Sequence, residues 1–150
     1  MGPVTVDLAR WIGVQLDEDE RIARAVVDAQ FITCAEWHAR GPFGDGDRFG
    51  NVQSDNREQI VEEDLLWPHA AHIAAHDPAR VLREVDVKRR QVEWCVEVIG
   101  DRDLSRYDEV GSLKDDKDAL AVTLAVETLR LLAWPYDARP GYRAKWAPTE

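Results

Sequence analysis

Residues 72–90 read HIAAHDPARVLREVDVKRR, and this stretch contains the end of one helix and the start of the next. Asp77 can cap a helix, and Pro78 suits the first helical position, where the backbone N–H has no helical partner. Apolar residues then recur at helical spacing as far as Ile99, and Gly100 is a typical residue after a helix end. The sequence therefore predicts a short helix from about Pro68 to His76 and a longer helix over 78–99.

The helix predicted over 78–99 is apolar on two sides. Its main stripe consists of Val81, Leu82, Val85, Val92, Val96 and Ile99. A second stripe, Val87, Trp94 and Val98, lies nearly opposite. Such a helix is sandwiched between other elements, or it offers one side to a partner.

The same helical spacing predicts two further helices. Residues 5–30 can form a single helix, in which Gly13 is the weakest position. Another helix is expected to start at a capping box formed by Ser112 and Asp115 and to run to about Ala133, before Pro135. Within residues 120–132 the polar side chains share one narrow stripe, so we expect this to be the central buried helix.

The expected fold class is mainly α: a single-domain helical bundle over residues 1–150. Residues 31–64 contain β-branched, aromatic and turn-forming residues, which leaves room for a small β-hairpin or irregular sheet between the first and second helical regions. Residues 135–150 are expected to form a C-terminal tail that packs on the helices.

The charge of the chain is strongly negative and unevenly distributed. The net charge is −10, of which residues 1–64 contribute −8. A protein that binds nucleic acid directly normally has a basic surface, so nucleic-acid binding is not expected. An acidic surface that imitates nucleic acid and inhibits a DNA-binding partner stays open as a hypothesis, beside the simpler role of charge in solubility.

The cysteines and the hydropathy pattern indicate a cytoplasmic protein without a membrane segment. Cys34 and Cys95 are far apart and form no C-x-x-C pair, which favours reduced thiols over a disulfide framework. No apolar run approaches the roughly 20 residues of a membrane span. The N-terminal residues lack the basic start and apolar core of a signal peptide.

Three histidines on the short helix are the candidate metal ligands. His69, His72 and His76 share one face, but His69 and His76 would stand about 10 Å apart along the axis. A straight helix can therefore offer one metal ion either His72 with His76 or His69 with His72. Such a pair would bind a divalent ion such as zinc as its cofactor. The alternative is a structural role, in which the imidazoles line a contact between helices and no cofactor binds.

His76 and Asp77 also form the adjacent pair found in HD phosphohydrolases. His38 upstream and an aspartate at 115, 116 or 118 would complete that order of ligands. Asp77 before Pro78 is already explained as a helix cap, however, and a capping carboxylate is occupied by backbone N–H groups. Metal-dependent hydrolysis of phosphate esters or nucleotides is kept as an alternative function.

The six tryptophans suggest a protein partner. Trp is enriched at the centres of interfaces, and Trp94, Trp37 and Trp67 are the candidate anchors. For any single tryptophan, packing in the core is the more common role.

Three blocks of sequence together resemble a known family. They are LDEDERIARA at 16–25, HIAAHDPARVLREV at 72–85, and TLRLLAWPY at 128–136, the last followed by Tyr142, Arg143 and Trp146. The family comprises small acidic proteins from actinobacteria and their phages and is catalogued as a domain of unknown function. The resemblance implies a cytoplasmic protein encoded by a bacterium or a phage, and it transfers no activity.

The leading functional hypothesis is a non-catalytic interaction or regulatory protein that binds a protein partner or another copy of itself. It rests on the absence of a complete catalytic motif, the two-sided helix over 78–99 and the abundance of tryptophan.

Overall fold

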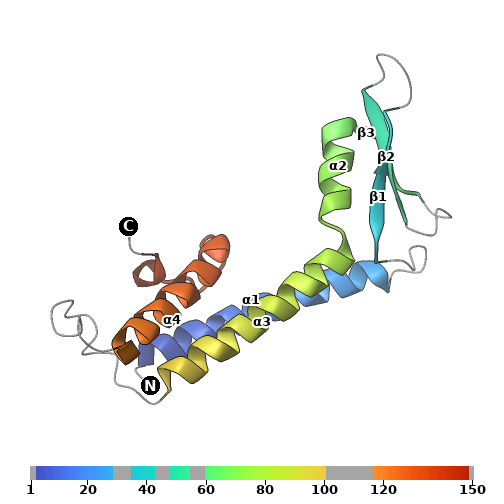
Figure 1. Cartoon of the computed structure of the whole chain (residues 1–150). Helices are drawn as coiled ribbons and strands as arrows, with labels where there is room; N and C mark the ends of the chain where they lie inside the picture. The colour runs from blue at the N-terminus through green and yellow to red at the C-terminus, as the bar shows by residue number, and fades with distance from the viewer. Residues whose placement is uncertain (1–2, 29–34, 43–47, 55–59, 101–116, 149–150) are drawn as a thin grey trace. The chain divides into compact units, whose positions relative to one another are not determined.

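The computed structural model describes residues 3–28, 35–42, 48–54, 60–100 and 117–148. In these residues the chain forms four α-helices, three strands and two short 3-10 helices (Figure 1). The expected mainly α class, with a small β element between the first two helical regions, is confirmed. The contacts divide the chain into a helical unit, residues 1–17 and 87–150, and a sheet unit, residues 18–86.

The elements follow the chain in a simple order. They are α1 (Pro3–Val27), β1 (Trp37–Arg40), β2 (Phe49–Ser54), β3 (Ile60–Leu66), α2 (Trp67–Ala75), α3 (Pro78–Ile99), α4 (Lys117–Ala133), η2 (Trp134–Tyr136) and η3 (Ala144–Trp146). The single first helix is confirmed, and it contains Gly13 without a break. Cys34 and the capping box at Ser112 and Asp115 lie outside the described residues.

The sheet unit contains a three-stranded antiparallel sheet in the order β1-β2-β3. Trp37 pairs with Ser54 and Phe49 with Leu66, with a register irregularity around Val52. Helix α2 lies against β1 and β2. Its first residue, Trp67, covers Gly50, where an added Cβ would stand 2.9 Å from a ring carbon of the indole and 2.8 Å from the carbonyl oxygen of Arg40.

Asp77 joins the start of α3 to the start of β1. Its Oδ1 accepts a hydrogen bond from the backbone N–H of Arg80 at 2.6 Å, which is the predicted cap. Its Oδ2 accepts a second hydrogen bond, from the backbone N–H of Trp37 at 3.2 Å. At the other end of α3, Gly100 has a φ of 56° and donates to the carbonyl of Val96. Both predicted limits of this helix are therefore confirmed.

The core of the helical unit is built from three helices and the C-terminal segment. The buried side chains there are Leu8, Ile12 and Leu16 of α1, Cys95 and Ile99 of α3, Val122 and Leu129 of α4, and Tyr136 and Trp146. The rings of Trp11, Tyr142 and Trp146 all contact one another, with Trp11 at centroid distances of 5.6 Å from Tyr142 and 5.5 Å from Trp146. The indole N–H of Trp11 donates to the carbonyl of Pro140 at 3.1 Å, so the C-terminal segment is held directly on α1.

Helix α4 was expected to be the central buried helix, but it is buried on one face only. Its inward face consists of Ala119, Val122, Ala125, Leu129 and Ala133. Three of its leucines lie on the outward face instead. The inward face is made mostly of small residues, and the larger leucines stand outside.

Candidate interaction surfaces and the histidine pair

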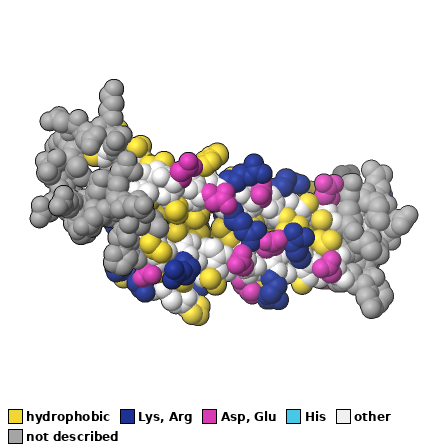
Figure 2. Space-filling model, turned by 90° about the horizontal axis from the view of Figure 1, so that it is seen from below, with side chains coloured by type: hydrophobic (Ala, Val, Ile, Leu, Met, Phe, Trp, Pro, Cys, Tyr) yellow, Lys and Arg dark blue, Asp and Glu magenta, His cyan; other side chains and the backbone are white. Residues whose placement is uncertain are grey.

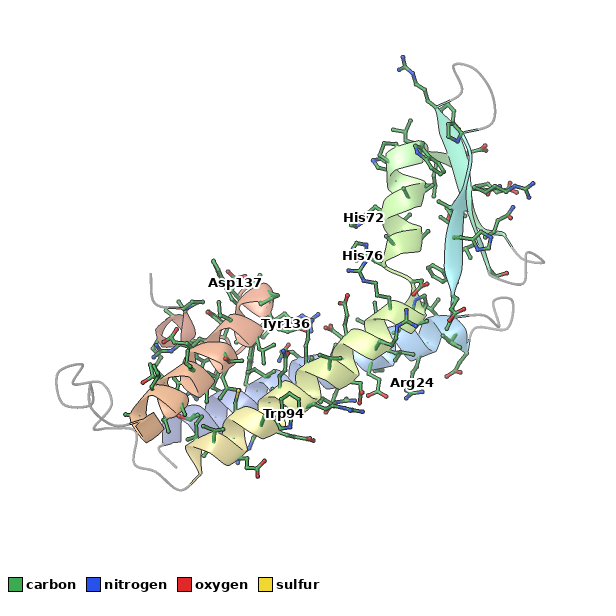
Figure 3. All side chains as sticks on the ribbon, in the orientation of Figure 1. Arg24, His72, His76, Trp94, Tyr136 and Asp137 are labelled. Atoms are coloured by element: carbon green, nitrogen blue, oxygen red, sulfur yellow. The ribbon has the colours of Figure 1, made fainter. Side chains whose placement is uncertain are left out.

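His72 and His76 lie together on the exposed side of α2 (Figure 3). Their ring centroids are 4.3 Å apart and their planes meet at 39°. The Nδ1 of His76 is 2.9 Å from the carbonyl oxygen of His72, one helical turn earlier. Because a carbonyl can only accept, Nδ1 is the donor of this hydrogen bond, which leaves Nε2 as the ring nitrogen that could bind a metal ion. A backbone bond of this kind is a common way to orient a metal-binding imidazole.

Further ligands for this pair are not assembled around it. His69 is also exposed on α2, and His38 is half-buried on β1. Asp77 follows His76 directly, but its carboxylate is engaged by Arg80 and Trp37. Within the described ranges, no group of three or more His, Cys, Asp and Glu side chains is arranged to hold a metal ion.

The three predicted tryptophan anchors occupy different environments. Trp94 is 65% exposed on α3, where it is labelled in Figure 3. Val87 and Val98, the other members of its stripe, are also exposed. Trp37 and Trp67 are half-buried in the sheet unit, where Trp37 opens β1 and Trp67 covers Gly50.

The most pronounced apolar surface is one that the sequence analysis missed. Leu120, Leu124, Leu131 and Trp134 are exposed by 63%, 59%, 55% and 55%. We call these four side chains the α4 face. The helix thus buries mainly alanine and valine and exposes three leucines, the reverse of what a solvent-facing helix normally shows. The sequence did contain an indication of this surface: residues 120–132 are apolar on more sides of the helix than one core-facing side can bury.

The polar side chains beside the α4 face already have partners within their own helix. The hydroxyl of Thr123 donates to the carbonyl of Ala119 at 2.9 Å, and that of Thr128 to the carbonyl of Leu124 at 2.7 Å. Arg130 forms a 2.6 Å ion pair with Glu127. Covering this face would therefore leave few polar groups without a hydrogen bond, which is the usual cost of burying a surface.

Cys95 is a core residue. It is buried in α3, and burial raises the pKa of its thiol, while a hydrogen bond with Thr128 of α4 acts in the opposite direction. A raised pKa keeps the thiol protonated at neutral pH, which is the unreactive form.

The acidic run at residues 17–20 is largely paired with arginines. Asp17 contacts Arg89 at 2.7 Å, while Glu18 and Glu20 contact Arg21 and Arg24 on the same helix, each also at 2.7 Å. Figure 2 shows positive and negative side chains interleaved on the face it presents. A nucleic-acid mimic needs carboxylates that are available to a basic partner, so these pairs give that hypothesis no support, and it stays a prediction.

None of the described helices combines the length and the apolar character that crossing a membrane requires. Comparison with curated proteins and with solved structures found no match to this chain. A family model does match, and it covers residues 5–148, nearly the whole sequence and all three blocks quoted above. The chain therefore belongs to a family of unknown function (DUF6221).

Proposed function

We propose that this protein is a non-catalytic interaction or regulatory protein of bacterial or phage origin, acting in the cytoplasm by docking another protein chain on the α4 face. The observation that carries the proposal is the outward placement of Leu120, Leu124 and Leu131 on α4, a helix that buries mostly small residues, together with exposed Trp134 at the start of η2. Exposed apolar groups gathered on one face are typical of interaction sites, whereas scattered ones are not. Trp134 supplies the aromatic group that often contributes most of the binding energy.

Photo-crosslinking inside the native cells tests this proposal. A benzoylphenylalanine is placed at position 124, which is 59% exposed, and in a matched control at position 14 of α1, where Val14 is 58% exposed. We expect a protein adduct from position 124 and far less from position 14. Adducts of equal yield from both positions, or from neither, would remove the basis for a docking face on α4.

A second candidate is a metal-dependent hydrolase of phosphate esters or nucleotides that uses His72 and His76. It is supported by the adjacent imidazoles and by the backbone bond that leaves Nε2 of His76 as the available nitrogen. The test is zinc titration of untagged protein followed by thermal unfolding. Binding at 100 times the dissociation constant stabilises the folded state by about 2.7 kcal/mol. We expect His76→Ala to abolish the zinc-dependent shift and His69→Ala to retain it; no shift in the parent protein would eliminate this candidate.

A further inference from the structure

The α4 face has the spacing of a helix-pairing seam. Leu120, Leu124, Glu127, Leu131 and Trp134 follow one another at intervals of four, three, four and three residues. This is the heptad pattern by which two helices pack side chains into one another. Four of the five positions are apolar and exposed, and the fifth, Glu127, stands at the centre of the stripe.

The central charges of the stripe suit a second copy of the same helix. Glu127 and Arg130 form an ion pair whose side chains are 28% and 22% exposed, respectively. In an antiparallel pairing whose twofold axis passes midway between Glu127 and Arg130, each Glu127 lies beside the partner's Arg130, so that the four charges alternate in sign. A parallel pairing would set Glu127 beside the partner's Glu127. The face is therefore complementary to itself in one orientation, as an interface with twofold symmetry requires.

The overall charge also selects this face for self-association. Two chains of net charge −10 repel each other over most of their surfaces. Between residues 119 and 134, however, the charged side chains are one glutamate and one arginine, which cancel. Two copies can approach here without bringing uncompensated charges together.

We propose that the α4 face is occupied by a second copy of this chain, paired antiparallel across a twofold axis midway between Glu127 and Arg130. This inference rests on the proposed function, because it names the partner of the same surface. Leu124 then packs near the partner's Trp134, and each Leu131 lies close to the twofold axis. One helix face is smaller than the roughly 800 Å² per partner of a standard interface, so the dissociation constant is expected to be on the order of micromolar.

Sedimentation equilibrium of the full chain over a wide concentration range measures this association. We expect Leu124→Asp to weaken it at least 10-fold and the matched control Val14→Asp to leave it unchanged. The two residues have nearly equal exposure, 59% and 58%, so an effect of added surface charge alone would appear in both. A parent chain that stays monomeric at every concentration, or equal weakening by both variants, overturns the proposal.

A charge-reversal pair keeps the test valid even if Leu124→Asp disturbs the fold. Glu127→Arg places like positive charges at the centre of the pairing, and Arg130→Glu places like negative charges there. We expect each variant alone to be monomeric and an equimolar mixture of the two to form a mixed dimer. If each variant alone dimerises as well as the parent chain, the contact lies elsewhere and the proposal is overturned. A mixture that forms no dimer overturns the antiparallel pairing of Glu127 with Arg130.

The mass of the crosslinked adduct distinguishes pairing between two copies of this chain from docking of a different protein. An adduct from position 124 at twice the mass of the chain supports pairing between copies. An adduct of any other mass, with a monomeric parent chain in sedimentation, overturns self-pairing and leaves the proposed interaction function standing. The absence of an adduct from position 124 overturns both.

Discussion

Two glycines of this chain occupy opposite environments. A Cβ at Gly50 would stand 2.8 Å from the carbonyl oxygen of Arg40 and 2.9 Å from the ring of Trp67, whereas a Cβ at Gly13 would have nothing within 4 Å. Gly50 is therefore required by the close approach of α2 to the sheet. Gly13 has no such role, and within a helix it costs stability relative to alanine.

We expect Gly50→Ala to lower the free energy of unfolding by about 1–3 kcal/mol, since the backbone oxygen cannot move aside easily. Gly13→Ala is the matched control and should raise it by about 0.5–1 kcal/mol. Urea denaturation of both variants measures the difference. Equal and small effects would show that Trp67 does not cover Gly50 tightly in solution.

The thiol of Cys95 gives a second prediction at the scale of one residue. In a Cys34→Ser background, we expect Cys95 to react with a disulfide reagent at pH 8 at least 10-fold more slowly than after denaturation. Burial raises its pKa, so the folded state favours the protonated thiol. The raised pKa also links the stability of the fold to pH. The protonated thiol contributes its full stabilisation of the folded state below the ordinary thiol pKa, and this contribution is lost as the pH rises through the raised pKa. Rapid reaction in the native state would place Cys95 at the surface.

At the scale of the element, the junction between α2 and α3 depends on one carboxylate. Asp77→Ala removes both the cap on α3 and the bond to the N–H of Trp37, and we expect a loss of about 1–2 kcal/mol. Asp77→Asn keeps one carbonyl acceptor and should lose less. Glu93→Ala, at an exposed position of α3, is the control and should change the stability little. Thermal unfolding ranks the three variants by their loss of stability. An equal loss in Asp77→Asn and Asp77→Ala would contradict the conclusion that Asp77 stabilises the junction through two hydrogen bonds.

The same junction shows how much of the structure the sequence can predict. The cap at Asp77 and the stop at Gly100 follow from local chemistry, so both could be located beforehand. The bond from Trp37 to Asp77 joins residues 40 positions apart, and no local pattern indicates it. The orientation of α4 could not be predicted either, because a nearly uniform apolar helix has no distinct inward side until its neighbours select one. For the same reason the α4 face was missed, while the His72 and His76 pair, set by helical spacing, was found.

At the scale of the whole molecule, the high negative charge makes self-association sensitive to salt. Raising NaCl from about 50 mM to about 500 mM screens repulsion between two acidic chains, while the apolar contact is retained. We therefore expect the dimer to tighten in sedimentation experiments as salt increases. Binding of a basic partner to the acidic N-terminal part would weaken instead, so the sign of the salt effect distinguishes the two kinds of complex. A dimer that weakens with salt would contradict the apolar seam.

The division of the chain has a consequence for its biosynthesis. Residues 18–86 are contiguous, whereas the helical unit combines residues 1–17 with residues 87–150. A ribosome therefore releases everything that the sheet unit needs before the helical unit can close. Trp11 emerges more than a hundred codons before its partners Pro140, Tyr142 and Trp146. Until then the apolar side of the nascent α1 lacks those contacts, so the helical unit can close only after the C-terminal residues have been synthesised.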